Sequence, residues 1–341
     1  MYHQPAFDFI DIRTGEVDSP QELSEPIDPH AYDDVIVAFS GGKDGIACVL
    51  ALIEMGIKPE LWHHDVDGGA DNFFDWPCTE SYVRKFAEHL GLPLYMSWRD
   101  GGIEGEMTKE EARTKAVYYE TPEGLKTSGG IRGKISTRKR WPAVSADLRV
   151  RWCSGVAKID VGAAALAGQE RFKGKKVLFV TGERRQESKA RSRYAESEPH
   201  RTHAPGKIAR RHVTHWRPVI DWSEKQVWDI IEKHGIVPHP CYRLGFSRAS
   251  CMICIFSSAR QAAAVRDLDP ERFAKVVKYE RDFDHTIRSD KGWKELVANV
   301  PKGQYDPEIA RLAMSREYDG PIFTEDWQLP SGAFGEACGP S

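Results

Sequence analysis

Short apolar runs alternate with amphipathic segments along the first hundred residues of the chain. Residues 33–39 (DDVIVAF), 60–67 (ELWHHDVD) and 92–98 (LPLYMSW) have the length and apolar content of strands in a buried sheet. Residues 46–56 and 79–91 instead place their apolar side chains at helical spacing. Because strands and helices alternate, the pattern predicts a parallel sheet with helices on both faces.

This alternation stops near residue 99 and returns at residue 175. Residues 99–150 contain glycine pairs and the basic run GGIRGKISTRKRWP, and we interpret them as an insertion over the carboxyl edge of the sheet. Residues 175–182 and 215–222 are predicted strands, and residues 223–235 a helix that begins with a capping box. The predicted fold class is α/β, a doubly wound and mainly parallel sheet with a helical C-terminal extension.

The length of 341 residues and a hydrophobic content of 40% suit one large domain or a core domain with an appendage. No apolar run approaches the length that crosses a bilayer, and the N-terminus lacks the pattern of a secretory signal. We therefore expect a cytoplasmic protein with no membrane partner. The predicted parts are an N-terminal arm (1–30), an α/β domain (31–240), and a cysteine-rich segment with a helical C-terminal region (241–341).

Charge is distributed unevenly along the chain, although the net charge is only -3. Residues 129–217 contain 22 Lys and Arg against 7 Asp and Glu, a net of +15, so the remainder carries -18. This segregation indicates either an anionic partner near the central third or a basic surface neutralised by acidic neighbours in the fold. Three tryptophans among these charges, at 141, 152 and 216, are compatible with a nucleic-acid track, but we expect at least two of them to belong to the core.

A glycine-rich turn joins the first predicted strand to the first predicted helix. Ser40, Gly41, Gly42, Lys43, Asp44 and Gly45 form the sequence SGGKDG. A turn of this kind directs backbone N–H groups and the positive end of a helix at one small volume, which favours a phosphate group. Lys43 adds a point charge, and Asp44 is suited to orient a metal ion or helix-terminal amides. The spacing matches neither the Walker motif nor a G-x-G-x-x-G dinucleotide motif.

The turn resembles the SGGxDS pyrophosphate loop of the PP-loop ATP pyrophosphatases and phosphoadenylyl-sulfate reductases, except that Gly45 replaces the usual serine. The segments VTGERRQESKARS and WRPVIDWSEKQVWDIIEKHGI also resemble that family. The resemblance implies the fold of the adenine-nucleotide alpha-hydrolases and a nucleotide pocket that includes the end of the second strand at Asp65. It further implies that four residues lie near the phosphates: Gly182, Arg184, Arg185 and Arg191. One arginine guanidinium can donate two parallel hydrogen bonds to the oxygens of a phosphate.

Four of the seven cysteines form a candidate ligand set. In a reducing compartment cysteines are expected to be ligands, nucleophiles or buried thiols rather than disulfides. Cys251 and Cys254 form a C-x-x-C unit, Cys241 precedes them by ten residues, and Cys153 starts a predicted helix. Four thiolates suit a tetrahedral metal ion or one cubane cluster. The arrangement resembles the iron–sulfur ATP pyrophosphatases of DNA phosphorothioation systems, which implies a [4Fe–4S] cluster, with structural Zn²⁺ as the alternative.

These observations together predict an enzyme that cleaves ATP to AMP and pyrophosphate. Lys43, Asp44, Arg184 and Arg191 are the predicted catalytic residues, with Mg²⁺ bridging the phosphate oxygens. The resemblance implies that the activated oxygen belongs to a phosphate of DNA, or of another nucleic acid, and that sulfur then replaces it. The implied partners are that nucleic acid and a sulfur donor such as a cysteine desulfurase.

Two alternatives remain open at this stage. The chain could be a phosphoadenylyl-sulfate or adenylyl-sulfate reductase, with Cys338 of the tail GEACGPS as its nucleophile. It could also be a non-catalytic iron–sulfur module that binds nucleic acid. Within the enzyme class, a tRNA base is a further candidate acceptor of sulfur.

Overall fold

An eight-stranded sheet forms the centre of the protein in a computed structural model, which describes residues 26–69, 71–145 and 147–334. Its strand order is β5-β4-β3-β2-β1-β6-β8-β7. The five strands β3, β2, β1, β6 and β8 are mutually parallel, whereas β4, β5 and β7 join the edges in antiparallel pairs. The predicted α/β fold with a mainly parallel sheet is confirmed. The strands are β1 Asp34–Ala38, β2 Glu60–Asp65, β3 Leu94–Arg99, β4 Val117–Thr121, β5 Gly124–Ser128, β6 Lys176–Val180, β7 Ser197–Pro199 and β8 His212–Trp216.

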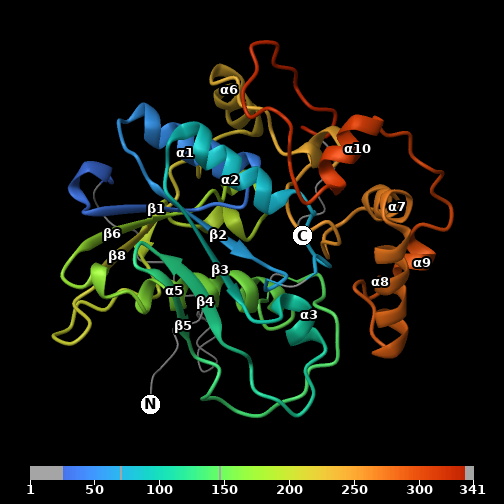
Figure 1. Ribbon diagram of the computed structural model, residues 1–341, viewed down its shortest axis with the longest axis horizontal. Helices are drawn as coiled ribbons and strands as arrows, with labels where there is room; N and C mark the ends of the chain where they lie inside the picture. The colour runs from blue at the N-terminus through green and yellow to red at the C-terminus, as the bar shows by residue number, and fades with distance from the viewer. Residues whose placement is uncertain (1–25, 70, 146, 335–341) are drawn as a thin grey trace.

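Helices cover both faces of this sheet (Figure 1). Helices α1, α2 and α6 pack on one face, where Val37 of β1 and Leu178 of β6 belong to the larger hydrophobic core. Helix α5 packs on the other face, where Ile36 and Phe179 from the same strands belong to a second core. Successive side chains of a strand point to opposite faces, so each apolar strand supplies both cores. The helices are α1 Lys43–Glu54, α2 Thr79–Leu90, α3 Gly102–Met107, α4 Trp152–Ser154, α5 Asp160–Ala167, α6 Glu224–Lys233, α7 Ala259–Leu268, α8 Pro270–Asp282, α9 Trp293–Leu296 and α10 Pro307–Met314.

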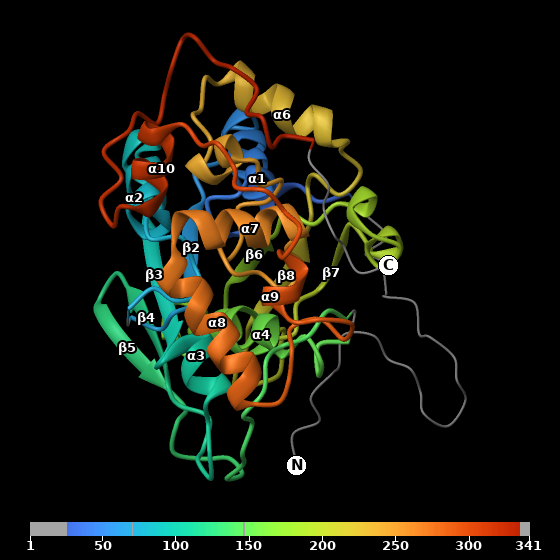
Figure 2. The ribbon, with the colours of Figure 1, turned by 90° about the vertical axis from the view of Figure 1, so that its right-hand side faces the viewer.

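The C-terminal helices α7, α8 and α9 lie together on one side of the molecule (Figure 2). Arg272 of α8 joins them to the loop after β2, because its guanidinium donates to the carbonyl oxygens of Asp75 at 2.7 Å and Asn72 at 3.1 Å. The hydroxyl of Tyr279 in α8 donates to Glu104 of α3 at 2.6 Å. The helical C-terminal extension predicted from sequence is therefore present and packs on the α/β core. Among the described residues, none of the helices is both long enough and apolar enough to cross a membrane.

The segment at 99–150 differs from its predicted role as an insertion over the sheet. It contains β4, which pairs with β3, and β5, which pairs with β4, and together they extend the sheet by two strands. In β4 the side chains of Val117, Tyr119 and Thr121 are buried and the two between them are half-buried, which is the alternation of an antiparallel strand with one face on the core. Strand β4 was not predicted because its alternation is short and the segment also contains glycine pairs and a basic run.

Two predicted element boundaries are also corrected. Helix α1 begins at Lys43 rather than at residue 46, so half of the predicted turn is the first turn of the helix. Strand β8 ends at Trp216, and the residues up to 222 form turns instead of a strand. The capping box of α6 is confirmed, because the Ser223 hydroxyl accepts from the Gln226 amide while the Gln226 side chain accepts from the Ser223 amide. The tryptophans at 141, 152 and 216 are all buried, which favours the core interpretation of these three side chains.

Candidate active site

The glycine-rich turn lies at the carboxyl end of β1, in the middle of the parallel part of the sheet. Gly41 has a φ of +75°, a backbone conformation that residues with a Cβ rarely adopt. Gly42 is the N-cap of α1, and a Cβ added there would lie 3.2 Å from the carbonyl oxygen of Ala249. The N-cap residue itself, a glycine, makes no side-chain hydrogen bond to the first turn of this helix. The first backbone amides of the helix and the positive end of its dipole therefore suit an anionic ligand. The absence of a side chain at Gly42 lets the backbone at Ala249 lie close to the turn.

Lys43 is only 3% exposed and lies among groups from its neighbour Asp44 and from two distant segments. Its Nζ is 3.3 Å from Oδ2 of Asp44, 3.4 Å from Oε1 of Glu224 and 3.4 Å from the carbonyl oxygen of Ser247. Its backbone amide donates to the hydroxyl of Tyr242 at 2.9 Å. The ammonium group is thus held in place by oxygen atoms, and the phosphate oxygens of a nucleotide can replace those oxygens as its partners.

Asp44 is held by cations on both of its oxygens. Arg184 donates from Nε to Oδ1 at 2.6 Å, while Lys43 contacts Oδ2. Burial opposes ionisation of this carboxyl, but the charges of Lys43 and Arg184 outweigh that effect and lower its pKa. Because both oxygens already have cationic partners, this geometry suits Asp44 for positioning Arg184 and Lys43 rather than for binding a metal ion.

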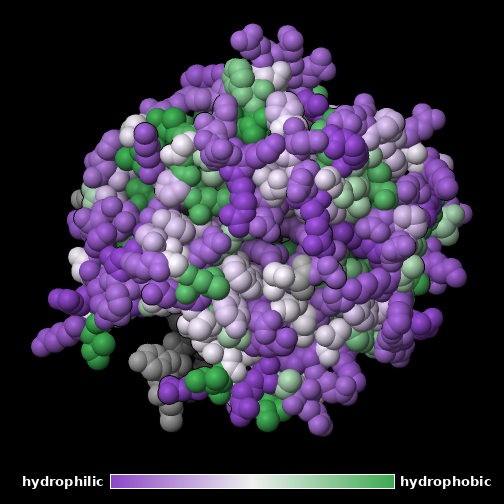
Figure 3. Space-filling view, in the orientation of Figure 1, coloured by the Kyte–Doolittle hydropathy of each residue, from purple (hydrophilic) through white to green (hydrophobic). Residues whose placement is uncertain are grey.

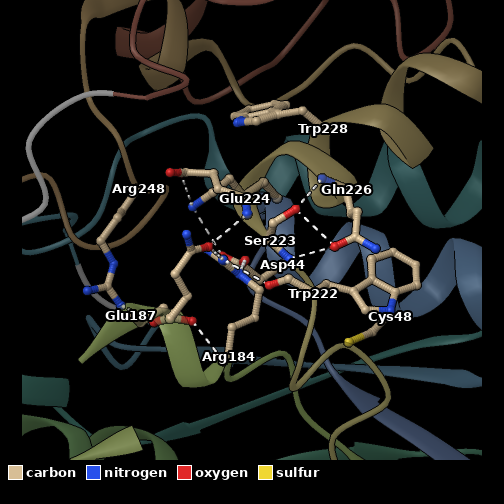
Figure 4. A network of polar contacts seen from close by, with 12 residues as sticks. Asp44, Cys48, Arg184, Glu187, Trp222, Ser223, Glu224, Gln226, Trp228 and Arg248 are labelled. Atoms are coloured by element: carbon tan, nitrogen blue, oxygen red, sulfur yellow. Dashed lines mark hydrogen bonds and ion pairs between the residues drawn. The ribbon is translucent and has the colours of Figure 1, made fainter. Parts of the chain in front are cut away.

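Arg184 also connects the loop after β6 to the start of α6 (Figure 4). Its Nη1 donates to Oε1 of Gln186 at 3.1 Å, and the same Oε1 accepts the backbone amide of Glu224 at 3.0 Å. Gly182 precedes this loop, and a Cβ added there would lie 2.8 Å from the backbone of Asp44. The loops after β1 and β6 and the N-terminus of α6 therefore meet at one point of the sheet edge, where parallel α/β folds bind their ligands.

The other two predicted arginines have different surroundings. Arg191 forms an ion pair with Glu187, which also lies 3.6 Å from Nη2 of Arg248. Figure 4 shows Arg248 and Glu187 beside Arg184, so this group adjoins the Asp44 network. Arg185 instead pairs with Asp221 and donates to the carbonyl oxygen of Tyr194. The structure thus brings Arg184 and Arg191 toward the turn, whereas the contacts of Arg185 are with the loops around Asp221 and Tyr194.

Asp65 ends β2, next to β1, as the sequence suggests. Its carboxylate accepts the backbone amides of Asp67 at 2.8 Å and Gly69 at 2.7 Å. These bonds shape the turn that follows the strand. The side chain therefore organises this edge of the sheet.

The four predicted cysteine ligands do not assemble into a metal site. Cys153, Cys251 and Cys254 are close enough for their charges to act on one another, and burial raises the pKa of Cys153 to about 11. Cys241 is fully buried, and its Sγ faces the carbonyl oxygen of Arg248 at 3.9 Å. Burial raises the pKa of the Cys241 thiol, and the nearby thiol of Cys78 raises it further. Within residues 26–334, the described His, Cys, Asp and Glu side chains form no group of three or more that could hold a metal ion. The [4Fe–4S] cluster and its zinc alternative therefore have no support from this donor set.

Comparison with known proteins identifies the family. Residues 34–257 match the family model described as phosphoadenosine phosphosulfate reductase domain. The chain belongs to this family. The matched range contains the turn, the loop after β6, the start of α6 and all four predicted cysteine ligands.

Two relatives of this phosphoadenosine phosphosulfate reductase domain protein are 31% and 26% identical to it in sequence. An uncharacterized 37.8 kDa protein of Escherichia phage 186 is 31% identical over 266 residues, covering 72% of this chain and 74% of the relative. An uncharacterized protein of Methanocaldococcus jannaschii is 26% identical over 263 residues, covering 76% of this chain but only 51% of the relative. Among solved structures, Candida glabrata FMN adenylyltransferase in complex with FMN and the ATP analogue AMPCPP aligns with 63% of this chain and 53% of its own, at 14% identity and a TM-score of 0.34.

Several residues at the site of this family member escaped the sequence analysis. Glu224, Tyr242, Ser247 and Arg248 contact the turn or its arginines through side chains or a carbonyl oxygen. Glu224 had a sequence signal, since an acidic residue directly after the Ser223 cap lies at the N-terminus of a helix that follows a strand. The sequence around Tyr242 does not indicate that this residue contacts the turn, because its partner Lys43 is 199 residues away.

Proposed function

We propose that this protein binds ATP at the Ser40–Gly45 turn and transfers its AMP group to an acceptor oxygen with release of pyrophosphate. The observation that carries the proposal is the N-terminus of α1, with Gly42 as its N-cap, beside the buried Lys43 at the carboxyl end of the central parallel strand. The acceptor oxygen forms a bond to the α-phosphorus while the bond from that phosphorus to the bridging oxygen breaks. The leaving pyrophosphate takes the electron pair of the broken bond.

The residues at the site supply positioning and charge in this proposal. The amides of the turn and Lys43 hold the terminal phosphates, where negative charge grows as pyrophosphate leaves. Arg184 fixes Asp44, and Asp44 in turn fixes Lys43. Arg191 and Arg248 supply further positive charge next to this network. Mg²⁺ reaches the site on the phosphate oxygens of ATP as part of the substrate.

The proposed acceptor is a phosphate oxygen of DNA or of another nucleic acid. A sulfur nucleophile would then attack the activated phosphorus, forming a P–S bond while AMP leaves with its oxygen. The sulfur would come from a donor protein such as a cysteine desulfurase, whose persulfide forms a P–S–S–protein link; a second thiol then cleaves the S–S bond, leaving the P–S group and a disulfide. This part of the proposal depends on the resemblance to the phosphorothioation enzymes and on the basic residues at 129–217. The predicted iron–sulfur cluster takes no part in any step described here.

Pyrophosphate release from Mg-ATP, with and without DNA, tests the proposal. Lys43→Ala should lower the rate roughly a hundredfold, because it removes a charge aimed at the leaving group. Lys58→Ala is the matched control, since Lys58 is an exposed lysine just after the same helix. Calorimetric ATP binding and a denaturation curve of Lys43→Ala separate a loss of function from a loss of fold. Equal release by a folded Lys43→Ala protein and the wild type would refute the proposed role of the turn.

The name of the family favours one alternative, a reductase of adenylyl sulfate or phosphoadenylyl sulfate. Its proposed nucleophile, Cys338, lies outside the residues that the structure describes. Sulfite release that is lost in Cys338→Ser, together with no pyrophosphate release from ATP, would favour the reductase. A non-catalytic module would bind nucleic acid equally well with and without ATP and would turn over neither substrate.

A further inference from the structure

A cationic pocket lies between the loop after α3 and the segment from β5 to α4, on residues that the ATP site does not use. The pocket has a volume of about 320 Å³. Ser136, Thr137 and Arg140 on its rim are exposed, whereas Lys109 is buried and Arg138 is half-buried. The lining residues are Lys109, Ser136, Thr137, Arg138 and Arg140.

Two of these cations are held rigidly by one buried carboxylate. Glu106, whose side chain is 2% exposed, accepts from Nζ of Lys109 at 2.5 Å and from Nη2 of Arg138 at 3.0 Å. The guanidinium of Arg138 also stacks on the indole of Trp152, with 4.4 Å between Cζ and the ring centroid. Side chains fixed in this way lose little conformational entropy when they bind a ligand.

The pocket keeps a positive charge after these internal contacts are counted. Lys109, Arg138 and Arg140 contribute three positive charges, and Glu106 removes one. Arg140 forms no ion pair or hydrogen bond with any residue that the structure describes, so its guanidinium is available to a ligand. Hydroxyl groups at Ser136 and Thr137 add hydrogen-bond donors. A phosphate group matches this combination of fixed cations and hydroxyls.

Further cations lead from the pocket to the ATP site. Arg151 precedes the tryptophan on which Arg138 stacks, and its buried Nε has no hydrogen-bond partner among the described residues. Burial lowers the pKa of Arg191, the charge of Glu183 opposes this effect, and the charges of Arg248 and Arg151 add to it. Arg248 and Arg191 both contact Glu187 beside the Asp44 network. Through the stacking of Arg138 on Trp152 and the contacts of Arg191 and Arg248 with Glu187, these arginines form a row of cations between the pocket and the turn.

We propose that the pocket of Lys109, Arg138 and Arg140 binds a backbone phosphate of a nucleic-acid strand whose reacting phosphate lies at the ATP site. A row of separate cations fits successive phosphates of one polymer, whereas a free phosphate ion would occupy the pocket alone. Ile131 and Ile135, exposed by 82% and 59%, flank two cations on the same segment and offer apolar contact to sugars and bases. The face shown in Figure 3 is mostly hydrophilic, with its apolar residues in small separate groups. This inference rests on the proposed function, because it names the binding site for the acceptor of that reaction.

The test measures binding of a fluorescent oligonucleotide of about 20 nucleotides by anisotropy over a range of salt concentrations. Arg140→Gln should weaken binding roughly fivefold at about 0.1 M salt and lower the salt slope by about 1. The matched control is Lys294→Gln, which removes an exposed charge on α9, outside the pocket, and should leave both quantities unchanged. The thermal midpoint of Arg140→Gln should equal that of the wild type, because Arg140 has no ion pair to lose.

Three outcomes would overturn the inference: oligonucleotide binding that Arg140→Gln does not change, an equal loss in Lys294→Gln, or binding of inorganic phosphate but no oligonucleotide by the wild type. Pyrophosphate release from ATP alone is measured in the same preparations. If the wild type releases pyrophosphate while Arg140→Gln keeps full oligonucleotide affinity, the pocket proposal fails and the ATP proposal stands. If Arg140→Gln loses affinity but the wild type never releases pyrophosphate, the opposite holds.

Discussion

Arg184 donates from Nε to Oδ1 of Asp44 at 2.6 Å and so joins the loop after β6 to the first turn of α1. The strands before these loops are neighbours in the sheet, with Val37 opposite Val180. Arg184 is 3% exposed, so the ion pair lies in a region from which water is largely excluded. The bond fixes the position of Asp44 and, through it, that of Lys43.

Arg184→Gln is expected to destabilise the fold by roughly 3 kcal/mol, because it leaves a largely buried carboxylate with one cation instead of two. The neighbouring Arg185→Gln is the matched control. Arg185 pairs with Asp221, whose side chain is 68% exposed, and loss of such a pair costs about 1 kcal/mol or less. Urea unfolding of both variants measures the difference. Equal losses of stability would show that the Arg184–Asp44 pair has no special structural role.

Gly182→Ala is expected to weaken ATP binding and to destabilise the protein by about 1–3 kcal/mol, as overpacking does. The added methyl group would lie 2.8 Å from the backbone carbon and oxygen of Asp44, so α1 or the loop after β6 must move. Gly206→Ala is the control, since a methyl group there meets nothing within 4 Å. Isothermal calorimetry with ATP and a denaturation curve provide the two readouts. Full ATP affinity in a stable Gly182→Ala protein would contradict the close packing at this point.

The sequence predicted the strands and helices that build the site better than the contacts within it. The run VIVAF is apolar enough to identify β1, and the capping box identified the start of α6. The position of Arg184 near Lys43 followed from a resemblance, whereas its bond to Asp44 required the register of β1 against β6. The role of Tyr242 could not be predicted, because it depends on how the chain returns to the turn after 199 residues. Strand β4 was missed because alternation over five residues is a weak signal beside glycine pairs and charges.

Asp75 is expected to make stability fall as the pH rises. Burial, and then the charge of Asp67, raises the pKa of Asp75 from 3.8 to about 7. The folded state therefore binds this proton more tightly than the unfolded state, and the stabilisation from protonated Asp75 is lost between about pH 4 and pH 7. Asp75→Asn mimics the protonated form and keeps an oxygen that can accept from the Trp76 amide, now at 2.8 Å from Oδ1.

The measurement for Asp75 is the free energy of unfolding of the wild type and Asp75→Asn at several pH values. The variant should gain on the wild type as the pH rises through this window. The comparison cancels other titrating groups, such as His239, whose burial lowers its pKa to about 3 in both proteins. A difference between the two proteins that does not change with pH would show that Asp75 is ionised in the folded state throughout.

Glu224 presents a negative charge to the group that should receive the phosphates of ATP. Its Oε1 is 3.4 Å from Nζ of Lys43, which it shares with Asp44 and the carbonyl oxygen of Ser247. A nucleotide must displace or tolerate this carboxylate. Glu224→Gln should therefore bind ATP more tightly, by about 1 kcal/mol or roughly fivefold, since an opposing charge near the phosphates is removed.

A control on the same helix isolates the effect of Glu224. Glu232→Gln changes the net charge by the same amount at an exposed position of α6 and should leave ATP affinity unchanged. Calorimetric titration with ATP in the presence and absence of Mg²⁺ distinguishes two roles for the carboxylate. If Glu224 opposes the phosphates, Glu224→Gln gains affinity under both conditions. If it instead ligates Mg²⁺ on the nucleotide, Glu224→Gln loses affinity for Mg-ATP alone, and the charge competition described here is wrong. The carboxylate lies beside Lys43 in the protein without nucleotide. Whether Glu224→Gln raises or lowers the affinity for Mg-ATP therefore decides what Glu224 does when ATP is bound.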